Sequence, residues 1–291
     1  MKYLSIITIT LILLSCSGAK QVVENTTKIK TDVEVETLTE VTSEEIETLT
    51  EAEVETVTSS ETIEITTEIE TDSIFYVNPI VSHDTWDGLL KKHVSNEGNV
   101  NYNGFKKDRK ELKSYIEFLS GYYNDEWSYE HKIAFWINAY NAMTVDLIIR
   151  NHPTKSIKDI KNPWDQRLWK IDNKWYNLNE IEHKILRKMN EPRIHFGIVC
   201  ASFSCPKLQN EAFTASKLDQ QLTKAAKEFL ADKKRNNISK NAIELSKIFK
   251  WFKKDFEHDG SLINFINKYS EIEVSSNAKK NYKAYNWDLN D

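Results

Sequence analysis

The sequence predicts an α+β fold: a single helix-rich domain with a small sheet at residues 73–291, after a signal peptide and a disordered acidic tether. All eight tryptophans lie between Trp86 and Trp287, so this part of the chain has the bulky apolar residues that a core needs. Within it, apolar residues at helical spacing alternate with a few short β-branched runs. Residues 17–72, in contrast, contain no aromatic residue. These observations favour one sizeable folded domain.

Residues 1–15 have the pattern of an export signal. Lys2 gives a positive start, and residues 3–14 are largely apolar but too few to span a bilayer as a helix. Small residues before Cys16 resemble the lipobox of bacterial lipoproteins, so we expect Cys16 to receive a diacylglycerol and further acyl chains such as palmitate. Ser17 rather than Asp follows, which favours an outer-membrane location in the cell envelope. A secreted protein with an incidental Cys16 is the alternative.

Residues 16–72 form the predicted tether. After Cys16 they are mostly Glu, Thr, Val, Ser and Ile, with no proline and one glycine. A segment with so much charge and so little bulky apolar surface cannot offset the entropy cost of ordering its backbone. We therefore interpret it as a disordered spacer that holds the domain away from a membrane. An interaction tail is the alternative.

Charge is divided unevenly along the chain. Residues 17–72 contain 16 acidic residues and three lysines, so their net charge is −13, while the whole chain has −5. With the charge of Lys2 also set aside, residues 73–291 have a net charge of +7. A basic domain is drawn to anionic lipid head groups or wall polymers, so an anionic envelope polymer or a protein is a possible partner. The sequence has no basic helix interleaved with aromatic residues, which is the pattern that would indicate nucleic-acid binding, so nucleic acid is not an expected partner.

The first elements of the domain are predicted as helices near residues 83–94, 106–120 and 129–150. The third has a broad apolar stripe that includes Ile133 and Leu147. It ends at His152-Pro153, because proline cannot continue a helix.

The later elements are mixed. Residues 167–178 predict a hairpin that turns at Asp172-Asn173. Asn179, with Glu182 three residues later, predicts the N-cap of a helix that continues to Met189. Buried β-branched residues predict a strand at 194–199. Helices are predicted near 215–231 and 247–268, with a short strand near 242–246.

Several blocks of this domain resemble a known family. They are AFWINAYNA (134–142), LNEIEHKILR (178–187), RIHFGIVCASFSCP (193–206), LSKIFKWFKKDF (245–256) and YNWDLN (285–290). Together they are similar to the Domain of Unknown Function 547 family, from His83 to the end of the sequence. The resemblance implies a bacterial secreted or lipid-anchored member, and no settled activity. Val199 stands where many members have Asn before the cysteine.

The block at 193–206 contains the candidate nucleophile, Cys200. A thiolate forms most readily next to a positive charge, a histidinium or a helix N-terminus. His195 and His183 are the candidate bases, although His195 points away from Cys200 if residues 193–199 form a strand. Asn138 and Asn141 lie three residues apart on one helix and share a face, from which an amide could orient a histidine or donate to an oxyanion. Such amides more often bind a neighbouring backbone.

Arg193, Ser202 and Tyr140 are candidate binding residues, although Tyr140 fits the core better than a ligand surface. The pair Cys200 and Cys205 is even in number once Cys16 is lipidated, so in an oxidising compartment a structural disulfide is the leading interpretation. A catalytic or redox thiol is the next, and a metal site is the weakest because the spacing does not match that of zinc sites. The sequence has no motif for a nucleotide or other cofactor.

Two functions remain open. The favoured one is a non-catalytic module that binds an envelope component in a polar cleft around His195 and Cys200. The alternative is a cysteine-dependent hydrolase or acyl transferase that acts on an envelope amide or ester.

Overall fold

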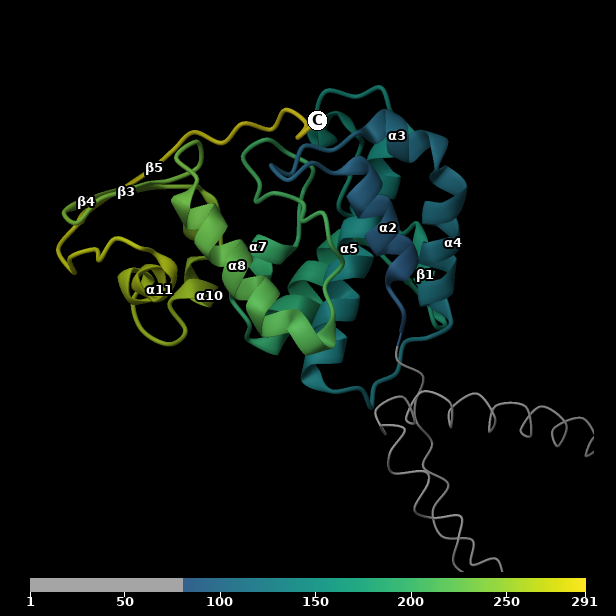
Figure 1. The fold of residues 1–291 in the computed structure, drawn as a ribbon, viewed down its shortest axis with the longest axis horizontal. Coiled ribbons are helices and arrows are strands. Elements are labelled where there is room, and N and C mark those ends of the chain that lie inside the picture. Colours follow the sequence, from purple (N-terminus) through teal and green to yellow (C-terminus); the bar gives the residue numbers. More distant parts are fainter. Residues whose placement is uncertain (1–80) are drawn as a thin grey trace, which may run out of the picture. The chain divides into compact units, whose positions relative to one another are not determined.

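The computed structural model describes residues 81–291 (Figure 1). The predicted signal peptide, Cys16 and the tether to residue 72 lie outside the described residues. The described chain is mainly helical with two small sheets, so the predicted α+β class is confirmed. Within residues 81–291, no helix is both long enough and apolar enough to cross a membrane.

Helix α5 (Tyr129–Asn151) is the centre of the first half of the fold, and every residue from Ile133 to Ile149 is buried. The side chain of Ser128 caps its first turn, and His152 ends it before Pro153, as predicted. Around it lie α2 (Asp84–His93), α3 (Tyr102–Lys107) and α4 (Arg109–Ser120) (Figure 1).

The middle of the chain wraps α5 with short elements. The predicted hairpin is confirmed, because β1 (Trp169–Ile171) pairs antiparallel with β2 (Lys174–Tyr176). Next come α6 (Leu178–Glu180), a π-helical turn (Ile181–Ile185), a 3₁₀ turn (Leu186–Met189) and α7 (Ile194–Gly197). Further 3₁₀ turns are Ile157–Asp159 and Ala215–Lys217.

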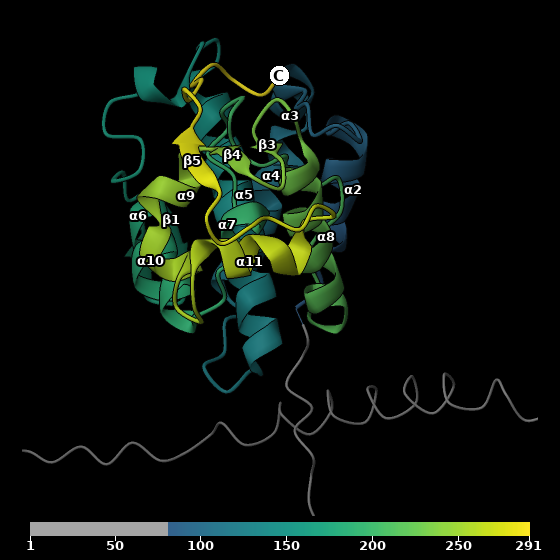
Figure 2. The same cartoon turned by 90° about the vertical axis from the view of Figure 1, so that its left-hand side faces the viewer.

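The last part combines helices with a three-stranded sheet. Its elements are α8 (Leu218–Ala231), β3 (Asn237–Ile238), β4 (Ala242–Leu245), α9 (Ile248–Trp251), α10 (Lys253–Phe256), α11 (Leu262–Tyr269) and β5 (Lys279–Tyr282). Strand β4 pairs antiparallel with β3 and parallel with β5. Figure 2 shows β5 beside β4, on the side of the molecule that also presents α9 and α11. The predicted helix over 215–231 and strand near 242–246 are confirmed.

Two apolar clusters fill this fold. The larger one surrounds α5 and includes Trp86, Phe105 and Trp136. The smaller one is rich in phenylalanine and joins α7 to α8–α11 through Phe196 and Phe249. Helix α7 therefore lies where the two clusters meet, and the segment that follows it begins at this junction.

The strand predicted at 194–199 is wrong, because these residues begin with the helical turn α7. The N–H of Ile198 donates to the C=O of Ile194 at 2.9 Å, which is helical spacing. All residues from 194 to 199 are buried, so their apolar character reflects burial on every side and does not distinguish strand from helix. Because residues 194–197 are helical, the prediction that His195 points away from Cys200 on a strand no longer applies.

Two other boundaries differ from the prediction. The N-cap expected at Asn179 is Asn177, whose Oδ1 accepts from the N–H of Glu180 at 2.7 Å. The single helix expected over 247–268 is divided into α9, α10 and α11. Gly260 has a φ of +136°, which only glycine adopts readily, and Ser261 then caps α11.

Candidate functional site

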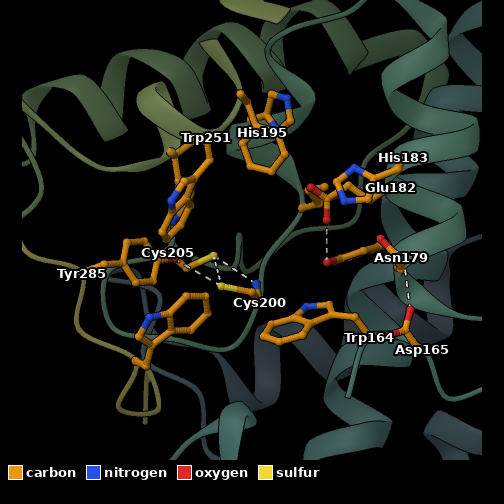
Figure 3. A pocket seen from close by; sticks show the side chains of 16 residues that line it. Trp164, Asp165, Asn179, Glu182, His183, His195, Cys200, Cys205, Trp251 and Tyr285 are labelled. Atoms are coloured by element: carbon orange, nitrogen blue, oxygen red, sulfur yellow. Dashed lines mark hydrogen bonds between the residues drawn. The ribbon is translucent and has the colours of Figure 1, made fainter. Parts of the chain in front are cut away.

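A pocket of about 350 Å³ lies where segments distant in sequence meet (Figure 3). It is lined by Tyr140, Trp164, Asp165, Asn179, Glu182, His183, His195, Ile198, Cys200, Cys205, Pro206, Ile248, Trp251, Phe252, Tyr285 and Trp287. Figure 3 shows the two sulfur atoms together on one side of it, and Glu182 with His183 on the other.

Cys200 and Cys205 have their sulfur atoms 3.1 Å apart and hydrogen-bonded to each other. Cys200 Sγ also lies 3.1 Å from the hydroxyl of Ser202 and 3.3 Å from that of Tyr285. We call these four residues the sulfur wall. A disulfide bond measures about 2.0 Å, so these are two thiols in contact. Their contact leaves the predicted disulfide within reach of a small movement, and that bond stays a prediction.

The two thiols differ in acidity and in access. The hydrogen bond with Cys205 lowers the pKa of Cys200, and the hydroxyls of Ser202 and Tyr285 act in the same direction. Burial raises the pKa of Cys205, and its hydrogen bond to Cys200 raises it further. Cys200 is half-buried and Cys205 is buried. Cys200 is therefore the thiol that loses its proton first and the one that a ligand reaches more easily.

The turn that carries the sulfur wall is held on both sides. Ala201 has a left-handed backbone with a φ of +56°, which redirects the chain directly after Cys200. Arg235 Nε donates to the C=O of Cys205 at 2.7 Å, and the N–H of Phe203 donates to the C=O of Asp288 at 2.7 Å. A strained residue held between such contacts is typical of a functional site.

Glu182 is the buried acid of the pocket, with 9% of its surface exposed. The hydroxyl of Tyr140 donates to its Oε2 at 3.2 Å. Burial raises the pKa of Glu182 to about 7, although the hydrogen bond from Tyr140 acts in the opposite direction. Its protonation therefore changes near neutral pH, a property shared by general acids and bases.

The histidine network consists of His183, Arg187, His195 and Asp255. Arg187 binds both carboxylate oxygens of Asp255, at 2.6 and 2.8 Å, and lies 3.0 Å from Nδ1 of His183. His195 Nε2 lies 2.8 Å from the same carboxylate. Burial lowers the pKa of both histidines, and the hydrogen bonds from Arg187 and His195 hold the pKa of Asp255 far below its usual range. The network is an ion pair that orients two neutral imidazoles.

Aromatic rings make up the remaining sides of the pocket. Tyr285 and Trp287 have ring centroids 4.6 Å apart, and Trp251 lies 4.8 Å from Tyr285. Trp164 meets Trp287 edge to face at 5.9 Å. Trp251 is 46% exposed, so part of this aromatic surface faces solvent. Such rings offer flat apolar faces next to a few polar groups, which is the usual composition of a small-ligand site.

The structure brings several of the predicted site residues together. Cys200, His195, His183 and Tyr140 all line the pocket, and Ser202 contacts Cys200. Within residues 81–291, neither histidine forms a hydrogen bond with Cys200. A direct pair of thiol and imidazole is therefore not present, although both face the same space.

Three other predicted residues lie elsewhere. Asn138 bonds to both backbone groups of Phe213, at 2.7 and 3.0 Å. Asn141 donates to the C=O of Gly197 at 2.8 Å and accepts from the N–H of Val199 at 3.0 Å. Both amides therefore fix backbone, and Asn141 does so directly before Cys200. The guanidinium of Arg193 is bound by acidic side chains outside the pocket.

Sequence reasoning did not select Glu182, Trp251 or Tyr285 as site residues. Glu182 lies in the π-helical turn after α6 and is buried. An acid four residues from both Leu178 and Leu186, a spacing that shares one helical face, is the signal that could have identified it. Tyr285 is 85 residues from Cys200, and no local pattern reports that contact. Asp255 similarly reaches His195 across 60 residues.

The described residues contain no group of three or more histidine, cysteine, aspartate or glutamate side chains placed to hold a metal ion. No curated protein and no solved structure matches the chain. Residues 124–230 match the model of the family described as "Protein of unknown function, DUF547", and this supports the predicted domain family over the part of the chain that contains Glu182 and both cysteines of the sulfur wall.

Proposed function

We propose that this chain is a bacterial cell-envelope lipoprotein, anchored through acylated Cys16 in the outer membrane, whose pocket binds an envelope component. The signal-like residues 1–15 and the small residues before Cys16 support the anchor. The pocket supports the binding role, because it places Glu182 and a thiol among aromatic rings in a space of about 350 Å³. That combination of aromatic faces with a few polar groups is the observation on which the proposal rests.

The chemistry of the pocket suits a ligand with both flat apolar faces and hydroxyl or amide groups. Trp251 and Trp287 offer ring faces. Glu182 can donate or accept a hydrogen bond according to its protonation, and Asn179, held by Asp165 at 3.1 Å, offers amide chemistry. The net charge of +7 on residues 73–291 attracts anionic wall polymers to the domain.

Tryptophan emission provides the test of binding. Soluble wall fragments are added to the purified chain, and we expect a saturable change in emission. Trp251→Ala is expected to weaken binding by at least about tenfold, because a ligand that stacks on this exposed ring would use it as a hot spot, and loss of such an aromatic anchor costs about 2 kcal/mol or more. Trp175→Ala is the matched control, since Trp175 is 53% exposed on β2 and does not line this pocket. Equal affinities for the two variants would contradict the proposal.

The anchor is tested separately. A Cys16→Ser chain expressed in a bacterium that carries the lipoprotein-processing enzymes is expected to leave the membrane fraction and to lose incorporation of labelled palmitate. Retention of the label in this variant would overturn the anchor and leave the binding role untouched.

A second function, cysteine-dependent hydrolysis or acyl transfer, is favoured by the lowered pKa of Cys200 within the pocket. Cys200 Sγ would attack the carbonyl carbon of an amide or ester, and the amine or alcohol would leave with a proton supplied by Glu182. Water or a second nucleophile would then release the acyl group from the thioester. Cys200→Ser is expected to abolish turnover of such a substrate while Cys205→Ser retains it.

A further inference from the structure

The two cysteines of the sulfur wall form a contact pair with unequal surroundings. The structure holds Cys200 Sγ next to two hydroxyl groups, those of Ser202 and Tyr285, at 3.1 and 3.3 Å. Cys205 Sγ accepts from the backbone N–H of Cys200 at 3.0 Å, and the hydroxyl of Tyr285 has only a small effect on its pKa. Each sulfur can therefore be stabilised as an anion, but mainly by different groups.

Their positions are also unequal. Cys200 is half-buried and Cys205 is 4% exposed, so only the first is open to an incoming molecule. Both line the pocket beside Tyr285 and Trp251, whose rings offer apolar faces to a bound segment. The contact of 3.1 Å between sulfur atoms means that they can bond to each other with a small approach.

We propose that Cys200 and Cys205 are a reactive dithiol that exchanges with disulfides: Cys200 attacks a disulfide brought into the pocket, and Cys205 then displaces the product. The substrate class is a disulfide carried by a small molecule or by an extended protein segment. This goes beyond the binding role proposed above and differs from acyl transfer, in which Cys205 has no part.

The proposed exchange consists of two successive displacements at sulfur. The Cys200 thiolate bonds to one sulfur of the substrate disulfide, the S–S bond breaks, and the other sulfur leaves as a thiolate. Cys205 then loses its proton to solvent, bonds to Cys200 Sγ, and displaces the second substrate sulfur as a thiolate. The protein dithiol is oxidised by two electrons and the substrate disulfide is reduced by two. A reduced thiol donor restores the dithiol by the reverse sequence.

The groups on the sulfur wall suit these steps. The hydroxyls of Ser202 and Tyr285 stabilise the attacking thiolate on Cys200, whose lowered pKa provides it near neutral pH. The backbone N–H of Cys200 is positioned to stabilise negative charge on Cys205 in the second step. The clamp from Arg235 to the C=O of Cys205 keeps the buried sulfur in place while its partner is attacked.

The test uses the full chain with Cys16→Ser, so that the sulfur wall contains the only thiols. Oxidised glutathione is added at neutral pH, and the products are resolved by mass spectrometry. We expect the number of free thiols per chain to fall from two to none. The product is an internal Cys200–Cys205 disulfide that dithiothreitol reduces in the native protein. In Cys205→Ser the reaction is expected to stop after the first step, with one glutathione bound to Cys200 as a mixed disulfide. Cys200→Ser is expected to react with glutathione at least about tenfold more slowly, because Cys205 is buried and less acidic.

Three results would overturn the proposal: an internal bond that resists dithiothreitol in the native protein, no trapped glutathione in Cys205→Ser, or equal reactivity in the two single variants. The first would indicate a structural disulfide. Thermal unfolding of each variant shows whether a lost reaction reflects a lost fold. Binding of wall fragments is measured on the same samples, so failure of exchange and failure of the binding role are separate outcomes.

Discussion

The histidine network and the sulfur wall lie around the same pocket but are stabilised in different ways. In the network, Arg187 and His195 share the carboxylate of Asp255, so formal charges are matched and bonded. On the sulfur wall, Cys200 meets hydroxyls and another thiol but no formal charge within hydrogen-bond distance. A matched ion pair resists changes in protonation, whereas a thiol held by neutral donors can gain or lose a proton at little cost. This difference suits the network to a supporting role and the sulfur wall to the proposed reaction.

Removal of Asp255 is the strongest test of the supporting role. Asp255→Ala deletes three hydrogen bonds to a carboxylate, leaves Arg187 without a counter-charge and leaves His195 without its hydrogen-bond partner. We expect the free energy of unfolding to fall by about 4 kcal/mol, measured by urea denaturation. Asp259→Ala is the control, since Asp259 is exposed and pairs only with exposed His258, and it should change stability by less than about 0.5 kcal/mol. Equal losses of unfolding free energy in the two variants would contradict a stabilising role of the network.

Glu182 allows a test of the pocket acid by pH. Its pKa of about 7 lies above the ordinary value of 4.5, so the folded state holds a proton that the unfolded chain releases. The stability that this proton provides is complete below pH 4.5 and is lost as the pH rises through 7. Between pH 5 and 8 we expect unfolding of the wild type to become easier by about 3 kcal/mol relative to Glu182→Gln. Glu126→Gln, an exposed site, should show the wild-type pH dependence.

Asn138 and Asn141 sharpen the comparison because they are matched in type and burial. Each binds two backbone groups, but Asn141 alone binds the segment that leads into Cys200. We expect either change to alanine to cost about 2 kcal/mol of stability. Only Asn141→Ala should change the rate of Cys200 alkylation by iodoacetamide, by about fivefold or more, because it releases the segment 197–199. Equal alkylation rates in the two variants would contradict this assignment.

The smallest expected effect comes from one hydroxyl of the sulfur wall. Tyr285→Phe removes a group 3.3 Å from Cys200 Sγ and 3.0 Å from Ser202 Oγ. Because that hydroxyl favours the thiolate, its loss should raise the pKa of Cys200 and slow alkylation at pH 7 by about threefold. The midpoint of the alkylation rate against pH is the measurement. Tyr282→Phe, on β5, should leave the midpoint unchanged.

Local signals in the sequence were sufficient for much of the fold. The apolar stripe of residues 133–148 and the proline after His152 define α5, and the turn at Asp172 defines the hairpin. The segment 194–199 could not be assigned in this way, because a short apolar run buried on all sides has no periodicity. The helix predicted at 247–268 is broken at Phe252, between α9 and α10, and again near Gly260, which has a positive φ, between α10 and α11.

The candidate site was predicted in part. Cys200, His183 and His195 were predicted as site residues, and all three line the pocket. They could be selected from the sequence because reactive side chains next to apolar residues are rare enough to stand out. Their partners were not found, since Asp255 and Tyr285 reach them across 60 and 85 residues of sequence. The pKa of Cys200 is lowered first by Cys205 and also by Ser202, both inside the block at 193–206. The contribution of Tyr285 lies outside that block and could not be read from it.

The segment 285–290 has one more consequence. It supplies Tyr285 and Trp287 to the pocket, and the hydroxyl of Tyr102 donates to Asn290 Oδ1 at 2.7 Å. Its backbone is also bonded at Asn286 and Asp288 to the turn that carries the sulfur wall. Residues 285–288 are partly or fully exposed. A local detachment of this segment, well short of global unfolding, would open the aromatic side and take one donor from Cys200 at the same moment. Ligand access and thiol acidity are thus tied to a single short stretch of backbone, and amide exchange along it should report both.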